Sequence, residues 1–176
     1  MNLRAIGCNF RTAAVEVREK LAFDGPALER AVGELASRYA IEAVVLGTCN
    51  RVELYVGRPD GLSPFDRRLA AEFLAESHGL PPDAVAPHLY EHVDDAAVRH
   101  LFRVSASLDS LIVGEGQIAG QVKQAFDLAR RLGATGPLLN AAFQHALAAA
   151  KRVRTETGIS RGHVSVSSVA VDYVRQ

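Results

Sequence analysis

Residues 41 to 56 read Ile-Glu-Ala-Val-Val-Leu-Gly-Thr-Cys-Asn-Arg-Val-Glu-Leu-Tyr-Val, and this stretch decides the fold. Positions 41 to 46 are mainly apolar and β-branched, positions 47 to 51 are polar or glycine, and positions 52 to 56 alternate apolar with polar residues. Apolar or alternating runs bounded by turn residues are typical of β-strands. The stretch therefore predicts two strands joined by a tight polar loop that contains Cys49.

Regular elements are predicted on both sides of this hairpin. Two further strands are expected, at residues 2 to 8 and 88 to 92. Helices are expected at 15 to 23, 25 to 39 and 65 to 77, and then from 94 onward with breaks at 109, 114 to 116, 133 to 137 and 158 to 162. A last helix starts near residue 164. This order predicts a small mixed α/β unit followed by an all-helical one, and it leaves the strand order open.

The composition is that of an ordinary globular protein. The chain has 176 residues, of which 48% are hydrophobic and 23% charged, enough to bury a core. It has neither a run of roughly 18 uncharged apolar residues nor a signal-peptide layout, so we expect a cytoplasmic protein without a membrane partner. Twenty basic and twenty acidic residues cancel. The total charge therefore gives no sign of a basic, nucleic-acid-binding surface.

The two cysteines, Cys8 and Cys49, are too few for a disulfide framework and do not form a zinc-ligand pattern. Cys49 follows a predicted buried strand, which would fix its position while the loop exposes its sulfur. A nearby cation such as Arg51 would raise its thiolate fraction, and Thr48 and Asn50 add hydrogen-bonding groups. The alternative is that Cys49 is a small hydrophobic residue at a strand end, as free cysteines often are.

The segment Thr48-Cys49-Asn50-Arg51-Val52-Glu53-Leu54-Tyr55 resembles the signature of glutamyl-tRNA reductases. Residues 9 to 23 are similar to the family's opening segment. Further blocks occur in the family's order: His100-Leu101-Phe102-Arg103-Val104, Leu108-Asp109-Ser110, Gly114-Glu115-Gly116-Gln117-Ile118, Gly120-Gln121-Val122-Lys123, Arg154-Thr155, Ile159, Gly162 and Val164-Ser165-Val166. The resemblance thus covers nearly the whole chain.

The resemblance implies an α+β fold, with a ferredoxin-like catalytic domain over residues 1 to 156 and a linker and the start of a long spine helix over 157 to 176. It implies the first step of tetrapyrrole (porphyrin) biosynthesis, in which a cysteine thioester forms from glutamyl-tRNA and NADPH reduces it to glutamate-1-semialdehyde. NADPH is then the cofactor of the full-length oxidoreductase, and none is expected on this chain. The implied partners are glutamyl-tRNA, a second copy in a homodimer, and glutamate-1-semialdehyde aminotransferase.

The resemblance also implies the site residues. Cys49 would be the nucleophile, and His100 would act near the carbonyl or the sulfur. Arg51 would bind the substrate γ-carboxylate and Glu115 its α-ammonium group, because a guanidinium grips a carboxylate bidentately and a carboxylate pairs with an ammonium. The other implied substrate contacts are Thr48, Asn50, Ser110, Gly116, Gln117 and Gln121. Without the resemblance, Glu115 and Gln117 read as ordinary residues of a helix start.

Several features depart from the family pattern. Phe10, Ala14, Gly47 and Gly116 stand where other residues are common in the family, and Gly116 loosens a loop that proline would stiffen. The family continues into a dinucleotide-binding domain and a dimerisation domain, so we expect this chain to lack hydride transfer. Gly114-x-Gly116-x-x-Ala119 fits a dinucleotide fingerprint, but the residues after it are predicted as helical and offer no following strand.

Two alternatives stay open. The chain can be a truncated homologue that recognises tRNA or a partner as a regulatory module without turnover. It can also be a thiol hydrolase or transferase of another acyl group, which would keep Cys49 but would not need the pair of Arg51 and Glu115 that suits glutamate.

Overall fold

The computed structural model describes residues 2–59, 61 and 63–159. The helix predicted to start near residue 164, and with it most of the linker and spine helix assigned to 157 to 176, lies outside the described residues.

The four predicted strands form one antiparallel sheet. They are β1 (Leu3–Asn9), β2 (Glu42–Thr48), β3 (Arg51–Gly57) and β4 (Tyr90–Val93), in the order β2-β3-β1-β4. Neighbouring strands pair antiparallel throughout, with Thr48 opposite Arg51 at one end of the hairpin and Gly7 opposite Glu53 within the sheet. This is the βαββαβ arrangement of ferredoxin-like folds. The predicted fold class is confirmed, and the structure supplies the strand order.

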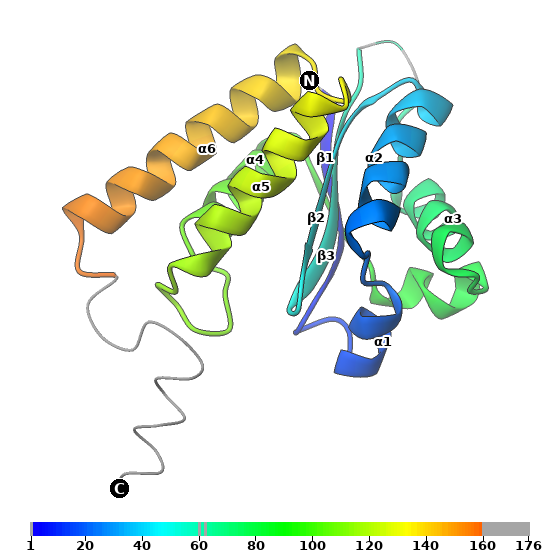
Figure 1. The fold of residues 1–176 in the computed structure, drawn as a ribbon, viewed down its shortest axis with the longest axis horizontal. Helices are drawn as coiled ribbons and strands as arrows, with labels where there is room; N and C mark the ends of the chain where they lie inside the picture. The colour runs from blue at the N-terminus through cyan, green and yellow to red at the C-terminus, as the bar shows by residue number, and fades with distance from the viewer. Residues whose placement is uncertain (1, 60, 62, 160–176) are drawn as a thin grey trace, which may run out of the picture.

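Helices cover both faces of the sheet (Figure 1). One face carries α2 and α3, with α1 beside them, and the other face carries α4, α5 and α6. The helices span α1 Val15–Lys20, α2 Gly25–Tyr39, α3 Arg67–His78, α4 Asp95–Ser105, α5 Gln117–Arg131 and α6 Pro137–Glu156, and short 3₁₀ turns occupy Pro82–Ala84 and Ala86–His88. None of the helices in the described part of the chain is long and apolar enough to cross a membrane.

Helix boundaries follow local chemistry in two cases and a long-range contact in a third. The Asp24 side chain accepts a hydrogen bond from the amide of Ala27 (2.7 Å) at the start of α2, and Gly79 ends α3 in a left-handed conformation (φ 64°). The start of α6 is capped by Glu42 on β2, whose carboxylate accepts hydrogen bonds from the amides of Leu138 (3.1 Å) and Leu139 (2.6 Å). Glu42 therefore joins the edge strand to the last helix.

Because helices cover both faces of the sheet, the alternation of apolar and polar residues in β3 does not indicate a face in water. Alternation usually indicates a strand with one face in water. Here all seven residues of β3 are buried, including Arg51, Glu53 and Tyr55. The polar face of the strand lies under α4 and α6, as the contacts of Tyr55 with His100 and Phe143 show. Its polar groups must therefore find partners inside the protein.

The segment between α4 and α5 differs from the prediction. The sequence predicts helix there, interrupted at 109 and at 114 to 116, whereas the structure has one irregular loop from 106 to 116. Positive φ angles at Ser107 (60°) and Gly114 (88°) are incompatible with a helix. The apolar side chains of Leu111 and Val113 in this loop are exposed and do not form the buried face of a helix.

Gly7 leaves the space that the Glu53 side chain occupies. A Cβ at position 7 would lie 2.7 Å from the Glu53 Cα and would also collide with the carbonyl oxygen of Val52. We predict that Gly7→Ala lowers the free energy of unfolding by about 1–3 kcal/mol, as overpacking does. The measurement is urea unfolding followed by circular dichroism.

Gly33 is the control for this prediction. It lies in α2, and nothing stands within 4 Å of an added Cβ. Gly33→Ala should raise the free energy of unfolding by about 0.5–1 kcal/mol, because alanine loses less backbone entropy in a helix. Equal stability of Gly7→Ala and the wild type would contradict the close approach of β1 to Glu53.

Candidate functional site

Cys49 lies at the tip of the hairpin between β2 and β3, and its side chain is exposed. The Thr48 hydroxyl accepts hydrogen bonds from the amides of Asn50 (3.1 Å) and Arg51 (3.2 Å), which closes the turn. The amide of Phe10 donates to the Asn50 carbonyl (3.0 Å) and ties the tip to the end of β1. The sequence prediction of a tight polar loop that exposes Cys49 is confirmed.

Arg18 holds the tip from the side of α1. Its Nε donates to the Cys49 carbonyl (3.3 Å), and its Nη1 donates to the Ala13 carbonyl (2.6 Å). The cation bonded to the backbone of the cysteine is thus Arg18, which sequence reasoning missed. Arg51, the cation expected beside the thiol, follows Asn50 in the chain, but its guanidinium points into the protein.

Four hydrogen-bond donors converge on the carboxylate of Glu53, which is fully buried. Arg51 Nη1 donates to Oε1 (2.7 Å) and the Tyr55 hydroxyl donates to Oε2 (2.6 Å). His100 Nε2 lies 2.8 Å from Oε1, and the Tyr90 hydroxyl also donates to Oε1. We call Glu53 and these four partners the Glu53 network. It joins β3, β4 and α4.

The network keeps its central carboxylate ionised. Burial alone would raise the pKa of Glu53, but the hydrogen bond from His100 and the charge of Arg51 lower the pKa to about 2. Burial would lower the pKa of Arg51, and the Glu53 carboxylate outweighs it and raises that pKa. The pKa of Tyr55 and of Tyr90 is raised, first by burial and then by the charge of Glu53. Both tyrosines therefore act as neutral donors.

An ionised Glu53 fixes the tautomer of His100. A carboxylate only accepts hydrogen bonds, so His100 Nε2 must carry a proton, and in the neutral ring Nδ1 is then an acceptor. The His92 ring stacks on the His100 ring with 4.5 Å between their centroids. Burial, followed by the proximity of His100, lowers the pKa of His92. His100 is therefore held in one orientation.

Asp109 connects this network to the loop between α4 and α5. Arg51 Nη2 donates to the Asp109 backbone carbonyl and to its Oδ2 (3.2 Å), while Arg11 Nη1 donates to Oδ1. Burial would raise the pKa of Asp109, but the hydrogen bond from Arg11 and the charge of Arg51 lower it. Both the hairpin that bears Cys49 and the α4–α5 loop are thus anchored on the Arg51 guanidinium.

A cavity of about 410 Å³ opens beside the network. His100, His92 and Tyr90 line one part of it, and Arg99 and Arg103 of α4 line another. Asn9 and Arg11 also line this cavity. They flank Phe10, whose amide is hydrogen-bonded to the hairpin tip. The cavity can hold a small anionic or polar group, because it combines arginines with oriented aromatic and imidazole rings.

The structure brings some of the predicted site residues together and leaves others apart. Thr48, Cys49, Asn50 and Arg51 share the hairpin, and Glu53 links Arg51 to His100. Ser110 is buried next to Asp109. Glu115, Gly116 and Gln117 lead into α5, and Gln121 lines a cavity of about 440 Å³ together with Gly47. Within the described ranges, no hydrogen bond or ion pair joins the side chains of Glu115 or Gln117 to the hairpin, so their substrate roles stay predictions.

The dinucleotide fingerprint does not have the structure that it needs. The residues before Gly114 form a loop, and α5 is followed by α6, so this segment has no strand–helix–strand unit. The described residues also contain no group of three or more His, Cys, Asp or Glu side chains that could hold a metal ion.

Sequence reasoning missed the partners that hold the site. From the sequence, Glu53 and Asp109 are only parts of longer matches, His92 has no arrangement that indicates catalysis or metal binding, and Tyr90 and Arg11 have no predicted role. One signal could have found Glu53. Three polar residues alternate along β3, while the strand must be buried if helices cover both faces, and Gly7 in an otherwise apolar strand indicates a close approach.

The lowered pKa of Glu53 predicts a loss of stability in acid. A carboxylate with an ordinary pKa near 4.5 when unfolded and about 2 when folded stabilises the protein above pH 4.5, and this contribution disappears as the pH falls toward 2. Asp109 acts in the same direction. We predict that Glu53→Gln weakens this acid dependence and costs about 3–5 kcal/mol at pH 7, because Arg51 loses one of its two buried carboxylate partners.

Urea unfolding at several pH values measures this effect. Glu72→Gln is the control, since Glu72 pairs with Arg68 on the exposed face of α3. This substitution should leave the loss of stability in acid unchanged. If Glu53→Gln loses as much unfolding free energy between neutral and acid pH as the wild type does, the network does not control the acid dependence.

Comparison with known proteins agrees with this geometry. Residues 6–157 match the family described as glutamyl-tRNAGlu reductase, N-terminal domain. The chain is 45% identical to a glutamyl-tRNA reductase of Geobacter sulfurreducens and 47% identical to one of Desulforudis audaxviator, and each match covers 100% of this chain and 40% or 39% of the relative. A solved glutamyl-tRNA reductase from Methanopyrus kandleri superimposes with a TM-score of 0.76 at 35% identity, over 99% of this chain and 39% of that one. The chain thus spans about two fifths of the length of these relatives, and it belongs to the glutamyl-tRNA reductase family as a counterpart of the N-terminal domain.

Proposed function

We propose that this chain carries the acyl-transfer half of a glutamyl-tRNA reductase. The Cys49 thiolate attacks the ester carbonyl carbon of glutamyl-tRNA, the bond from that carbon to the ribose oxygen breaks, and the tRNA leaves as an alcohol after taking up a proton. The glutamyl group stays on the sulfur as a thioester. The observation that carries this proposal is the exposed Cys49 on a hairpin anchored to the Glu53 network.

The hairpin supports the role of a nucleophile because its position is fixed while its tip is open. Thr48, Phe10 and Arg18 hold the backbone on both sides of the sulfur, so attack costs little reorganisation. The other cysteine, Cys8, is fully buried in β1, and burial raises the pKa of its thiol. Of the two thiols, only Cys49 is exposed to a substrate.

His100 is proposed to move the proton. Its Nε2 proton is committed to Glu53, which leaves Nδ1 as the atom that accepts and returns a proton. A histidine oriented by a buried carboxylate is the arrangement that general base catalysis uses. The lining of the neighbouring cavity by His100 supports access of that ring to a bound substrate.

Recognition of the glutamyl group needs cations for its carboxylate. Arg51 already donates to Glu53 and Asp109, so it binds a substrate carboxylate only where that group replaces Asp109. The cavity beside His100 adds Arg11, Arg99 and Arg103 as further guanidinium groups. We propose that the γ-carboxylate takes the place of the Asp109 carboxylate and that Glu115 pairs with the α-ammonium group. Ser110, Gln117 and Gln121 complete the proposed contacts.

Reduction by NADPH to glutamate-1-semialdehyde is proposed for the whole protein. The steps proposed for this chain end at the thioester. Entry into tetrapyrrole synthesis, a homodimer and contact with the following aminotransferase are likewise proposed for the whole protein.

An acyl adduct on Cys49 is the predicted outcome of the direct test. The chain is mixed with glutamyl-tRNA without NADPH, quenched in acid and weighed intact by mass spectrometry. We expect one glutamyl group on the wild type and none on Cys49→Ser, with Cys8 unmodified because it is buried. A parallel reaction with a small α-ester of glutamate separates acyl transfer from recognition of RNA.

The same experiment distinguishes the alternatives. If the tRNA stays charged and no adduct forms with either substrate, Cys49 is not the nucleophile of this chain, and a binding module without turnover becomes the better account. An adduct that forms equally well from esters of other amino acids would favour a general acyl transferase.

A further inference from the structure

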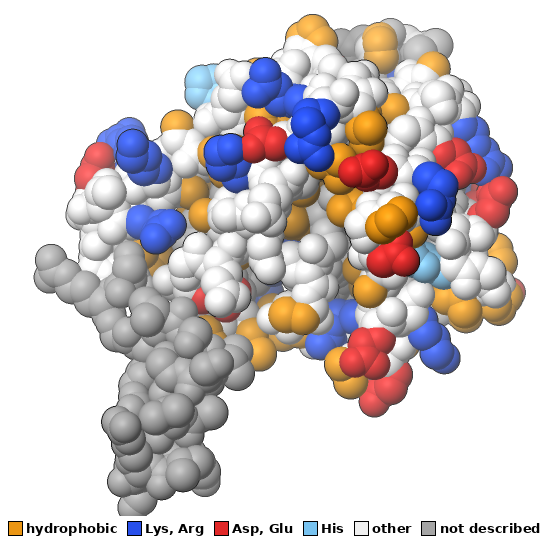
Figure 2. All heavy atoms as spheres, in the orientation of Figure 1, with side chains coloured by type: hydrophobic (Ala, Val, Ile, Leu, Met, Phe, Trp, Pro, Cys, Tyr) orange, Lys and Arg blue, Asp and Glu red, His pale blue; other side chains and the backbone are white. Residues whose placement is uncertain are grey.

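The total charge of zero conceals an uneven distribution. Residues 117 to 156, which contain α5 and α6, carry six Lys and Arg but only two Asp and Glu. Because the whole chain has 20 of each, the remainder carries the opposite excess. Figure 2 shows blue side chains gathered over the α5 and α6 side of the molecule. The neutral composition is therefore compatible with a basic surface on this side of the molecule.

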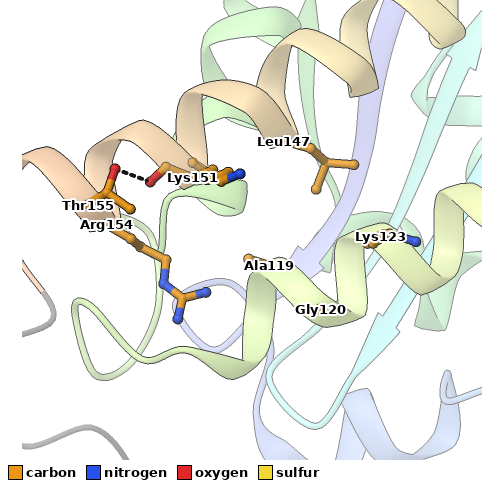
Figure 3. A pocket seen from close by; sticks show the side chains of 8 residues that line it. Ala119, Gly120, Lys123, Leu147, Lys151, Arg154 and Thr155 are labelled. Carbon is orange, nitrogen blue, oxygen red and sulfur yellow. Dashed lines mark hydrogen bonds between the residues drawn. The ribbon is translucent and has the colours of Figure 1, made fainter.

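Part of this excess surrounds a groove between α5 and α6 (Figure 3). The groove has a volume of about 430 Å³. Lys123 of α5 and Lys151 and Arg154 of α6 line it, over a floor that includes Ala119 and Gly120. Small residues let a bulky group come close to the backbone, and cations from two helices surround it. We refer to this as the α5–α6 groove.

Lys123 and Lys151 of the groove are available to a ligand. The Lys123 ammonium pairs with Asp127 (2.5 Å), but both are exposed and such a pair is weak. No ion pair between described residues engages Lys151. Favourable charge at the C-terminus of α6 accounts for basic residues in its last turns, but it does not account for Lys123 on the opposite wall.

The groove lies on α5, the helix that packs against β2, the strand leading to Cys49. Gly120 lines the groove, while the next residue, Gln121, lines the cavity that contains Gly47 of β2. Consecutive residues of a helix point about 100° apart, so the groove and the cavity beside Gly47 lie on neighbouring faces of α5. Gly47 precedes Cys49 by two residues. A chain bound in the groove could place its end at the hairpin tip.

We infer that the α5–α6 groove binds the phosphate backbone near the aminoacylated end of the tRNA. This inference rests on the proposed function, because the polyanion that must approach Cys49 there is the tRNA that carries the glutamyl ester. Lysines and arginines on a groove with small residues suit phosphates, which bring high charge without requiring base-specific contacts. An acidic protein segment is the competing occupant.

The test measures binding of deacylated, fluorescein-labelled glutamate tRNA to the chain by anisotropy at several salt concentrations. If Lys123 and Lys151 each contact one phosphate, Lys123→Gln/Lys151→Gln should lower the slope of log affinity against log salt by about 1.4–1.8 and weaken binding roughly tenfold or more near 0.1 M salt. The control is Arg130→Gln/Arg152→Gln, which removes the same charge from the same helices outside the groove. It should change the affinity much less.

A second readout separates this inference from the proposed catalysis. The groove variant should form the Cys49 adduct from a small glutamate α-ester at the wild-type rate, and Cys49→Ser should bind tRNA normally. If the groove variant loses tRNA binding while the wild type forms no Cys49 adduct, the groove assignment stands and the catalytic proposal is wrong.

Three results would overturn the groove assignment. These are unchanged tRNA binding by the groove variant, an equal loss in the control variant, and displacement of the tRNA by poly-glutamate at lower concentration than by unlabelled RNA. The last result would identify an acidic protein as the better occupant.

Discussion

The buried carboxylate of Glu53 is the constraint on which the rest of the site depends. A charge in the interior costs several kcal/mol unless it is paired and fully hydrogen-bonded. Glu53 meets this condition with donors from β3, β4 and α4, and Arg51 extends the connection to the α4–α5 loop. Elements far apart in the sequence must therefore be in place together before the charge is compensated.

The same constraint explains how a small sheet supports chemistry at its edge. In this antiparallel sheet the hairpin between β2 and β3 ends at the tip that bears Cys49, and Arg51 is the first residue of β3. The network inside the sheet thus begins two residues from Cys49. His100 reaches the same carboxylate from α4. One buried carboxylate thus positions both the start of β3, next to the Cys49 hairpin, and the ring of His100.

Much of the fold could be predicted from local sequence. The strand–loop–strand pattern of residues 41 to 56 and the start of α2 at Asp24 follow from signals that act within a few residues. The cap of α6 by Glu42 and the exposure of Val113 could not be predicted, because each depends on contacts between distant segments. The hairpin that bears Cys49 is among the features that local sequence predicts.

The Glu53 network, in contrast, depends on contacts between distant segments and could not be predicted from local sequence. An Arg-x-Glu-x-Tyr strand reads as half-exposed when taken alone, and only the position of α4 makes Glu53 the centre of a network. The same limit applies to charge. A count over the whole chain gives zero, whereas the packing of α5 against α6 gathers cations from both helices around one groove.

An ionised Glu53 should hold His100 in one tautomer beside the hairpin that bears Cys49. Long-range proton–nitrogen correlation spectra of the histidine rings measure this directly at neutral pH. We expect His100 to show a protonated Nε2 and an unprotonated Nδ1, and Glu53→Gln to change this pattern. A His100 ring protonated at Nδ1 alone, or a tautomer mixture unaffected by Glu53→Gln, would contradict it.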